Sequence, residues 1–181
     1  MTYQSTILIV PGLGNSDEDH WQTRWERAFG FQRINQKDWD TPLCSDWIET
    51  IDRKVSSLNS ESVILVGHSL ACSTIGYWSK KYNRKIKGAL LVGPSDTEAD
   101  TYPTGTTGFS HMPLHPLPFK SIVVASTNDF YVSFDRAKLF AEKWGSELVT
   151  IGNAGHINVA AGYGEWNFGL ELLKKLDEAK V

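Results

Sequence analysis

The chain has little of what a disulfide framework or a membrane span requires. Its 181 residues include two cysteines, Cys44 and Cys72, which are too few for a disulfide-stapled scaffold or, by themselves, for a zinc site. No apolar run approaches the roughly 18 residues of a membrane-spanning helix. Residues 1–5 lack the basic patch and apolar stretch of a secretory signal. We therefore expect a cytoplasmic protein with no membrane partner.

Positive charge is also scarce. Lys and Arg together number 18 against 21 Asp and Glu, which gives a formal net charge of −3. Nucleic-acid-binding proteins neutralise phosphates with clustered basic side chains, so we expect no nucleic-acid partner. Hydrophobic residues make up 41% of the chain, enough for a core, and the length is typical of one domain. We predict a single domain over residues 1–181, as a monomer or small homo-oligomer.

Short apolar runs alternate with longer amphipathic segments along the chain. Runs that predict strands lie at 6–10, 62–67, 89–92, 121–125 and 147–151, with a weaker candidate at 31–35. Segments with apolar residues at helical spacing lie at 21–29, 45–58, 70–82, 136–144 and 166–179. Continuous apolar strands are typical of parallel sheets that are buried on both faces. The alternation therefore predicts an α/β fold, a three-layer αβα sandwich around about six mostly parallel strands.

Two connecting segments stand out. Ser16, with Asp19 three residues later, resembles a capping box and predicts a helix that begins there. Residues 94–118 hold five of the seven prolines. This segment is too rich in proline for a helix and too long for a routine connection, which indicates a functional or flexible loop.

The sequence Gly67-His68-Ser69-Leu70-Ala71 directly follows a predicted strand and opens a predicted helix. This is the setting of the G-x-S-x-G nucleophile elbow, with alanine in place of the last glycine. The sharp turn needs small neighbours and lifts the serine hydroxyl above the sheet. We therefore predict that Ser69 is a catalytic nucleophile. The alternative is an ordinary turn in which Ser69 caps the helix.

Backbone amides that could stabilise an oxyanion lie on both sides of this serine. The Leu70 N–H stands at a helix N-terminus. A second donor is expected from the loop after the first strand, where glycines let the backbone turn its amides. Leu13 is the predicted donor there, and Gly12 is the second choice. A phosphate site is not predicted, because the third glycine of a G-x-G-x-x-G pattern would fall at Asp17 and no Walker lysine follows.

A serine nucleophile needs a base that is itself oriented by a third group. Asp129 lies in the loop after the fourth main predicted strand, and His156 lies in the loop after the last one. Because the carboxyl ends of parallel strands share one edge of a sheet, both are expected near Ser69. We predict a triad of Ser69, Asp129 and His156. Asp96, which follows the third main strand, is the alternative acid.

The other histidines fit the role of base less well. His68 lies inside the sharp turn, and we expect it to point away from the serine in a packing or hydrogen-bonding role. His20, at the start of the first predicted helix, is predicted to line the substrate pocket, with a structural role as the alternative. His111 and His115 are four residues apart, but the proline between them excludes a regular zinc-binding helix face. No metal or cofactor is predicted.

Taken together, these motifs resemble the α/β-hydrolase superfamily, and more closely the small serine hydrolases related to retinoblastoma-binding protein nine. The matching segments are Val10-Pro11-Gly12, His20-Trp21-Gln22-Thr23-Arg24-Trp25, Gly67-His68-Ser69-Leu70, Asn128-Asp129-Phe130-Tyr131-Val132, Gly155-His156-Ile157-Asn158 and Gly162-Tyr163-Gly164-Glu165-Trp166. The resemblance covers essentially the whole chain. It implies a compact α/β-hydrolase fold, with a six-stranded sheet that lacks the first two strands of larger relatives, and the same triad.

From these residues we expect a serine hydrolase that cleaves ester, or amide and peptide, bonds of a small-molecule substrate through an acyl-enzyme intermediate. Gly12, Phe130 and Tyr131, with the loops at 13–20 and 94–118, are predicted to form its pocket. The alternative is a catalytically weak or inactive protein that uses the same fold as an interaction module, to which the seven tryptophans could contribute. Thiol chemistry through Cys72 is less favoured, because no partner cysteine lies nearby.

Overall fold

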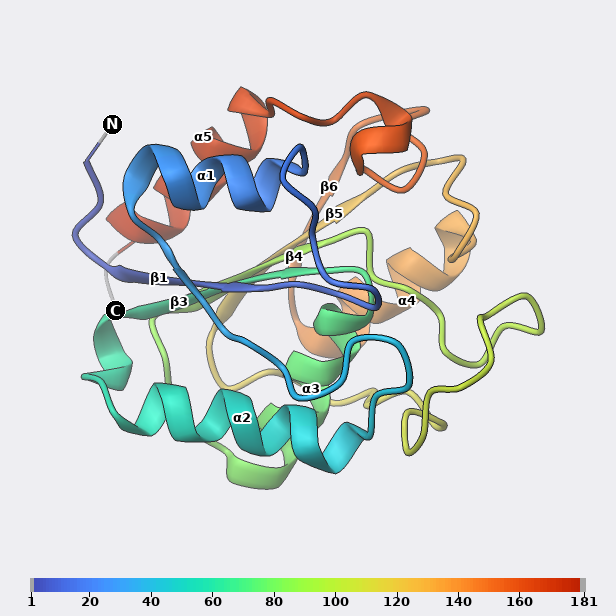
Figure 1. The fold of residues 1–181 in the computed structure, drawn as a ribbon, viewed down its shortest axis with the longest axis horizontal. Helices are drawn as coiled ribbons and strands as arrows, with labels where there is room; N and C mark the ends of the chain where they lie inside the picture. The colour runs from blue at the N-terminus through green and yellow to red at the C-terminus, as the bar shows by residue number, and fades with distance from the viewer. Residues whose placement is uncertain (1, 180–181) are drawn as a thin grey trace.

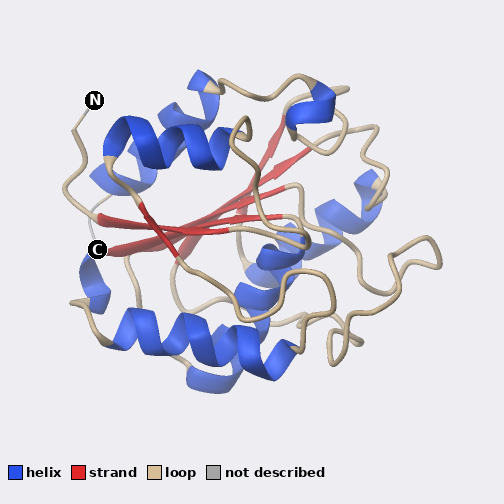
Figure 2. Ribbon diagram, in the orientation of Figure 1, coloured by secondary structure: helices blue, strands red, loops and turns tan. Residues whose placement is uncertain are grey.

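Six parallel strands form one sheet in the order β2-β1-β3-β4-β5-β6 in the computed structural model, which describes residues 2–179 (Figures 1 and 2). The strands are β1 (Thr6–Val10), β2 (Gln32–Arg33), β3 (Val63–His68), β4 (Gly88–Val92), β5 (Lys120–Ala125) and β6 (Glu147–Thr150). The helices are α1 (Trp21–Phe29), α2 (Cys44–Ser56), α3 (Leu70–Tyr82), α4 (Phe134–Trp144) and α5 (Asn167–Glu178), with short 3₁₀ turns at Ser60–Ser62 and Val159–Ala161. The predicted α/β fold with about six mostly parallel strands is confirmed.

The helices cover both faces of the sheet. Helices α1 and α5 lie on one face, and α2, α3 and α4 lie on the other (Figure 1). Successive side chains of each strand point to opposite faces of the sheet. In β1, Ile7 and Ile9 pack against the layer of α1 and α5, whereas Leu8 and Val10 pack against the layer on the other face. This explains why the strands are apolar throughout instead of alternating with polar residues. No helix within residues 2–179 is long and apolar enough to cross a membrane.

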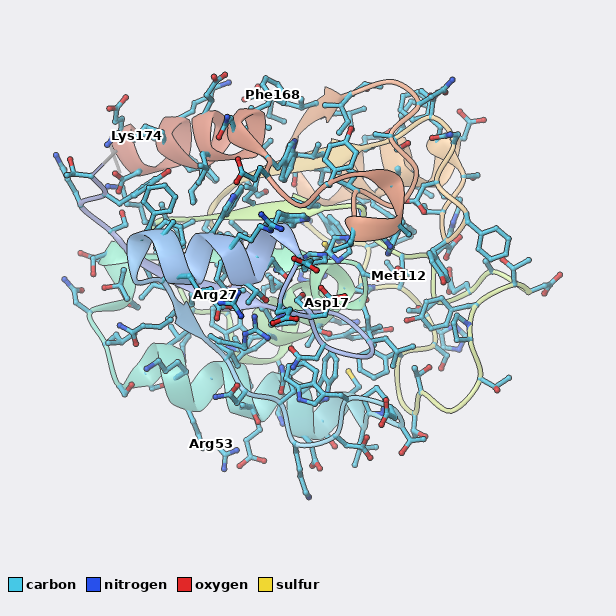
Figure 3. The ribbon with its side chains drawn as sticks, turned by 45° about the horizontal axis from the view of Figure 1, so that its top comes forward. Asp17, Arg27, Arg53, Met112, Phe168 and Lys174 are labelled. Carbon is cyan, nitrogen blue, oxygen red and sulfur yellow. The ribbon has the colours of Figure 1, made fainter. Side chains whose placement is uncertain are left out.

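The outer faces of the helices are charged. Arg27 of α1 and Arg53 of α2 point away from the sheet (Figure 3), and their side chains are 62% and 69% exposed. Charged side chains on the solvent face and apolar ones beneath are the pattern of a helix with one buried side. The three-layer arrangement therefore follows from the amphipathic spacing of the segments.

The strand order places a crevice at the point where the chain changes direction. The chain passes from β1 to β2 on one side and then returns to β3 on the other side of β1. In open α/β sheets, ligands bind outside the carboxyl ends of the strands at such a switch point. The loops that leave β1 and β3 there begin at Pro11 and Ser69. The fold thus brings the predicted nucleophile and the glycine-containing loop to the same place.

The first helix does not begin as the sequence predicted. The N-cap of α1 is His20, whose Nδ1 accepts a hydrogen bond from the Gln22 N–H at 3.2 Å. The predicted capping box at Ser16 and Asp19 is wrong, because the Ser16 hydroxyl instead donates to Gln22 Oε1 at 2.7 Å. Asp17 Oδ1 accepts the backbone N–H groups of Asp19 and His20 and so forms a separate turn before the helix.

The N-terminal segment is fastened to the last helix by one buried carboxylate. Asp177 in α5 is 1% exposed, and its carboxylate accepts the backbone N–H groups of Gln4 and Ser5 as well as the Lys174 ammonium. Burial alone would raise the pKa of Asp177, but these hydrogen bonds outweigh it and hold the pKa below its usual value. The carboxylate therefore fixes the start of β1, the strand that leads to the crevice.

Replacing Asp177 by alanine should lower the free energy of unfolding by about 1–3 kcal/mol, because two backbone donors and a lysine lose their acceptor. Urea denaturation at pH 7 measures this change. The matched control is Glu178→Ala in the same turn, whose side chain is 66% exposed and whose loss should change stability by about 0.5 kcal/mol or less. Equal effects of the two substitutions would show that Asp177 is not an anchor.

Candidate active site

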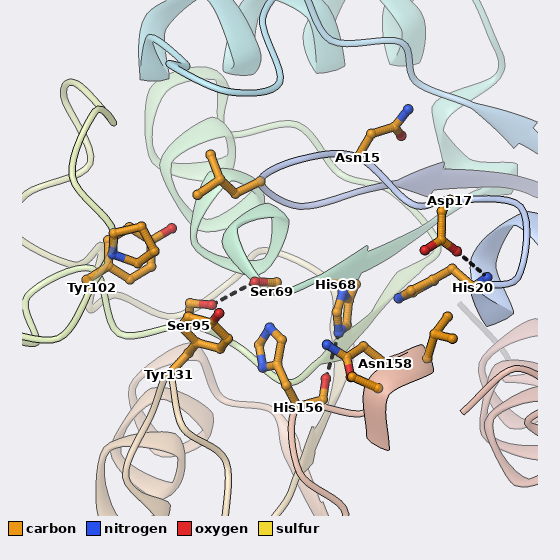
Figure 4. Close-up of a pocket in the computed structure, with 14 residues that line it drawn as sticks. Asn15, Asp17, His20, His68, Ser69, Ser95, Tyr102, Tyr131, His156 and Asn158 are labelled. Carbon is orange, nitrogen blue, oxygen red and sulfur yellow. Dashed lines mark hydrogen bonds between the residues drawn. The ribbon is translucent and has the colours of Figure 1, made fainter. Parts of the chain in front are cut away.

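Ser69 stands at a strained turn between β3 and α3. Its φ of 59° and ψ of −125° are a rare combination for a residue other than glycine, and such backbones cost about 1–3 kcal/mol. The backbone N–H donates to the Val92 carbonyl at 3.0 Å, which ties the turn to β4. The Ser69 side chain makes no capping hydrogen bond to α3. The hydroxyl is therefore available to the space above the sheet (Figure 4).

Asp129 and His156 meet across the loops that follow β5 and β6. His156 Nδ1 lies 3.0 and 2.9 Å from the two carboxylate oxygens of Asp129. The Asp129 side chain is fully buried and that of His156 is 10% exposed. A carboxylate can only accept hydrogen bonds, so Nδ1 carries the proton and donates it. In the neutral ring, Nε2 is then left as the basic nitrogen.

The alternative acid, Asp96, is engaged elsewhere. Its carboxylate oxygens receive two hydrogen bonds from Arg136 of α4, at 2.6 and 2.9 Å, and Arg136 also binds Glu98 at 2.6 Å. Asp96 also accepts the backbone N–H of Glu98. These contacts give it a structural role in the loop after β4. Asp129, not Asp96, is the carboxylate that contacts His156.

The hydroxyl of Ser69 has a partner that the sequence did not predict. Ser69 Oγ lies 2.8 Å from Ser95 Oγ (Figure 4), whereas no hydrogen bond joins Ser69 to His156 in the described residues. Ser95 is fully buried in the loop after β4. A polar residue just past a central strand was the one signal of its position. Nothing in the sequence showed that its side chain would face the serine.

Three histidine rings stand side by side next to this serine. The ring centroids of His156 and His68 are 4.8 Å apart, as are those of His68 and His20. His68 does not point away as expected: it lines the pocket, and its Nε2 donates to the His156 carbonyl at 2.9 Å. Burial lowers the pKa of His68 well below its usual value and that of His20 to about 4. Both rings are therefore neutral at pH 7.

The loop after β1 packs against the turn that carries the serine. A Cβ atom at Gly12 would lie 2.7 Å from the His68 carbonyl oxygen, 2.8 Å from Ser69 Cβ and 3.3 Å from the Leu70 nitrogen. Only glycine therefore fits at this position. The adjoining Leu13 lines the pocket. Among the turn and loop hydrogen bonds of residues 2–179, none is donated by the backbone N–H of Leu13. The Leu70 N–H is the first of α3, and the first N–H groups of a helix have no partner within the helix.

These groups border one pocket of about 300 Å³. Its lining residues are Leu13, Asn15, Asp17, His20, His68, Ser69, Ser95, Tyr102, Pro103, Tyr131, His156, Asn158, Val159 and Ala160. Of the predicted pocket residues, His20 and Tyr131 line it. Gly12 lies beneath it at the serine turn. Phe130 does not line it: that ring is 71% exposed and borders a second hollow, which shares Tyr131 and His156 with the pocket.

The described residues offer no arrangement for a metal or a reactive thiol. No group of three or more His, Cys, Asp or Glu side chains within residues 2–179 could hold a metal ion. His115 Nε2 is 3.0 Å from Ser79 Oγ, whereas the His111 side chain is 97% exposed and lies 3.9 Å from Glu98. Burial raises the pKa values of the Cys72 and Cys44 thiols. Both thiols therefore stay protonated, and thiolate chemistry is disfavoured.

Comparisons with known proteins identify a family and a shared fold. A family model described as serine hydrolase matches residues 7–175. A YdeN-like protein from Pectobacterium atrosepticum is 37% identical, with a TM-score of 0.84 over 97% of this chain and 91% of the other. The ydeN gene product of Bacillus subtilis is 21% identical, with a TM-score of 0.81 over 97% and 100%. Carboxylesterase CesB of Bacillus subtilis is 13% identical, with a TM-score of 0.69 over 98% and 85%.

At these lower identities the two Bacillus structures show likeness of fold alone. The curated proteins include no match to this chain. The resemblance to small serine hydrolases of the α/β-hydrolase superfamily is confirmed by the family match and by the fold of these structures.

The buried His20 predicts a loss of stability in acid. Its pKa is about 4 in the folded protein against 6.5 as its ordinary value, so the unfolded chain binds the proton first as the pH falls. The stabilising contribution of neutral His20 is complete above pH 6.5 and is lost between pH 6.5 and 4. Over that interval, wild type should lose about 3 kcal/mol more unfolding free energy than His20→Asn.

Urea denaturation of both proteins at several pH values from 4 to 7 measures this difference. The matched control is His111→Asn, because the His111 side chain is 97% exposed and its substitution should leave the pH dependence as in wild type. If wild type and His20→Asn lost stability in parallel, His20 would not be buried as a neutral ring.

Proposed function

Because this chain belongs to the serine hydrolase family, we propose that it hydrolyses esters of small molecules, with Ser69 as the nucleophile, His156 as the base and Asp129 as the acid that orients it. The observation that carries this proposal is the pairing of His156 Nδ1 with both oxygens of Asp129, in the same pocket as a serine held at a strained turn. A serine nucleophile that is deprotonated by a histidine, which a carboxylate orients, is an arrangement that cleaves esters through an acyl-enzyme.

The first half of the proposed reaction forms an acyl-enzyme. Ser69 Oγ leaves Ser95 and donates its proton to His156 Nε2 as it attacks the ester carbonyl carbon. The carbonyl electrons move to the oxygen, which the N–H groups of Leu13 and Leu70 stabilise. When the carbonyl re-forms, the alcohol leaves and takes the proton from His156. Asp129 stabilises the positive charge that His156 carries between these steps.

The second half repeats the sequence with water as the nucleophile. Water donates a proton to His156 as it attacks the acyl carbon, and the same two amides stabilise the second oxyanion. Ser69 then leaves with the proton from His156, which releases the acid and restores the enzyme. No step needs an oxidant, a metal or a second substrate other than water.

The bond between Ser69 and Ser95 supports a resting position for the nucleophile. In that position the serine proton has a buried partner, so the hydroxyl is ordered before a substrate arrives. In the proposed reaction, rotation about the Ser69 side chain exchanges Ser95 for His156, which lines the same pocket. Apo forms of hydrolytic sites commonly have long or unformed catalytic hydrogen bonds that close only with substrate bound.

The size and lining of the pocket favour small substrates. A volume of about 300 Å³ lies at the lower end of the range for small-molecule sites. Its walls come from the end of β3 and from the loops after β1, β3, β4, β5 and β6, which belong to one sheet. This supports a single domain whose partner is a small-molecule ester. Carboxylesterase CesB, a protein of like fold, supports esters over amides as the first substrates to test.

Ser69→Ala should lower kcat/KM for p-nitrophenyl acetate and p-nitrophenyl butyrate by about a thousandfold or more, because no acyl-enzyme can form. Steady-state release of p-nitrophenol measures the change. The control is Cys72→Ala, three residues further along α3, which should keep at least about a third of the wild-type rate. Equal rates for wild type and Ser69→Ala would contradict the nucleophile. They would leave the interaction-module alternative in its place.

Asp129→Asn should lower kcat by about a thousandfold or more, because the amide NH₂ can donate to Nδ1 of His156 and favour the other tautomer, and because an uncharged amide does not stabilise the imidazolium. Asp96→Asn is the matched control on the neighbouring loop. It should lower the thermal midpoint by weakening the buried pair with Arg136, while kcat at 25 °C stays within about fivefold of wild type. Greater loss of kcat in Asp96→Asn than in Asp129→Asn would reverse the two assignments.

A further inference from the structure

We propose that the Nε2–H group of His20 binds a second oxygen of the substrate, one that lies in the alcohol part of the ester. This inference rests on the proposed ester hydrolysis and names the substrate class more closely. The preferred ester would carry an uncharged acceptor, such as an ether, carbonyl or hydroxyl oxygen, a few bonds beyond the ester oxygen. His20 would select for that oxygen without taking part in bond breaking.

The role of His20 as the N-cap of α1 determines which of its two ring nitrogens carries the proton. Nδ1 accepts the Gln22 N–H at 3.2 Å, so Nδ1 carries a lone pair and no proton. The ring is 6% exposed, and burial lowers its pKa to about 4, so the ring is neutral at pH 7. A neutral imidazole has one N–H, which must then be on Nε2. The helix cap thereby fixes His20 as a donor at Nε2.

This donor has no partner within residues 2–179. His20 Nε2 is buried and makes no hydrogen bond, although the ring lines the same pocket as Ser69 and His156. Asp17 is close in the loop, but its Oδ1 binds backbone N–H groups at Asp19 and His20 itself. Buried donors without partners are rare in folded proteins. Because the Nε2 atom itself is almost fully covered, a ligand oxygen binds this donor when the side chains that cover it move apart on substrate binding.

The position of His20 assigns it to the alcohol side of the ester. The leaving oxygen must face His156, which returns the proton to it. From His156 the rings of His68 and His20 continue in one row, each centroid 4.8 Å from the next. Ser95 and Tyr102 lie on the opposite side of Ser69 from His20 (Figure 4). An alcohol group that extends beyond His156 would therefore run along the histidine row.

His68 cannot supply this contact in place of His20. Its Nε2 already donates to the His156 carbonyl at 2.9 Å, which occupies the proton of that neutral ring. The charged side chain that lines the pocket in the described residues is the Asp17 carboxylate, and no lysine or arginine lines it. A carboxylate or phosphate on the substrate would lack a counter-ion and meet Asp17. The matching acceptor is therefore an uncharged oxygen.

The experiment compares pairs of esters that differ by one atom. Butyl acetate is paired with 2-methoxyethyl acetate, and pentyl acetate with 3-methoxypropyl acetate, so that an ether oxygen replaces one CH₂ group in the alcohol. For each pair, the ratio of kcat/KM for the ether ester to kcat/KM for the alkyl ester is measured by indicator-monitored acid release. Comparing this ratio between variants cancels the intrinsic reactivity of the esters.

Two substitutions separate the helix cap from the donor. Asn at position 20 keeps an acceptor for the Gln22 N–H, because asparagine is a favoured N-cap residue, but it lacks a group at the Nε2 position. Gln at position 20 carries an amide N–H that can reach the Nε2 position, but it does not keep the cap. If His20 had only a structural role, the ether-to-alkyl ratio of kcat/KM would fall in step with the stability of each variant. Urea denaturation measures that stability.

We expect His20→Asn to lower the ether-to-alkyl ratio at least fivefold in one or both alcohol pairs, and His20→Gln to restore part of it despite lower stability. As a control, the acyl pair ethyl butyrate and ethyl methoxyacetate should give the same ratio in wild type and His20→Asn. An unchanged ratio in both alcohol pairs, or a change confined to the acyl pair, would overturn the inference. If wild type hydrolysed neither these esters nor p-nitrophenyl acetate and p-nitrophenyl butyrate, the proposed function itself would fail.

Discussion

The Asp129 carboxylate accepts the Nδ1 proton of His156, and this interaction decides which nitrogen of the imidazole can act on Ser69. With Nδ1 committed to a buried anion, Nε2 is the basic nitrogen of the neutral ring. In the proposed reaction, Asp129 is also the counter-ion for the positive charge that His156 gains from Ser69. The proposed chemistry of the pocket therefore depends on the tautomer of one ring.

The sheet makes that interaction possible because all its strands run the same way. Ser69, Asp129 and His156 are separated by 60 and 27 residues along the chain, yet each follows the carboxyl end of a strand, and these ends share one edge. The strand order also sets the loop after β1 against the serine turn, where Gly12 leaves room for close approach. Two further neutral histidines fill the space beside the base, and one of them caps the first helix.

Much of the fold was predictable from the sequence, because its rules are local or periodic. The helix predicted at 70–82 has the bounds of α3, since Ser69 at the turn and the residues after Tyr82 end its pattern on both sides. The start of α1 was predicted wrongly, because the Ser16 hydroxyl does not cap the helix. It instead donates a hydrogen bond to the Gln22 side chain, a side-chain contact that the capping pattern does not predict. The contact of Ser69 with Ser95 lay beyond sequence reasoning for the same reason. Asp96 and Asp129 both follow strands, and Arg136, which distinguishes them, comes from a distant helix.

Covalent labelling with a fluorophosphonate probe, followed by mass spectrometry of the peptides, tests the activated serine most directly. If His156 and Asp129 activate Ser69, wild type should take up one phosphonyl group per chain on Ser69, and His156→Ala should label at least about a hundredfold more slowly. Absence of a label on Ser69 in folded wild-type protein would contradict an activated nucleophile. Equal labelling rates in wild type and His156→Ala would contradict the role of His156 as its base.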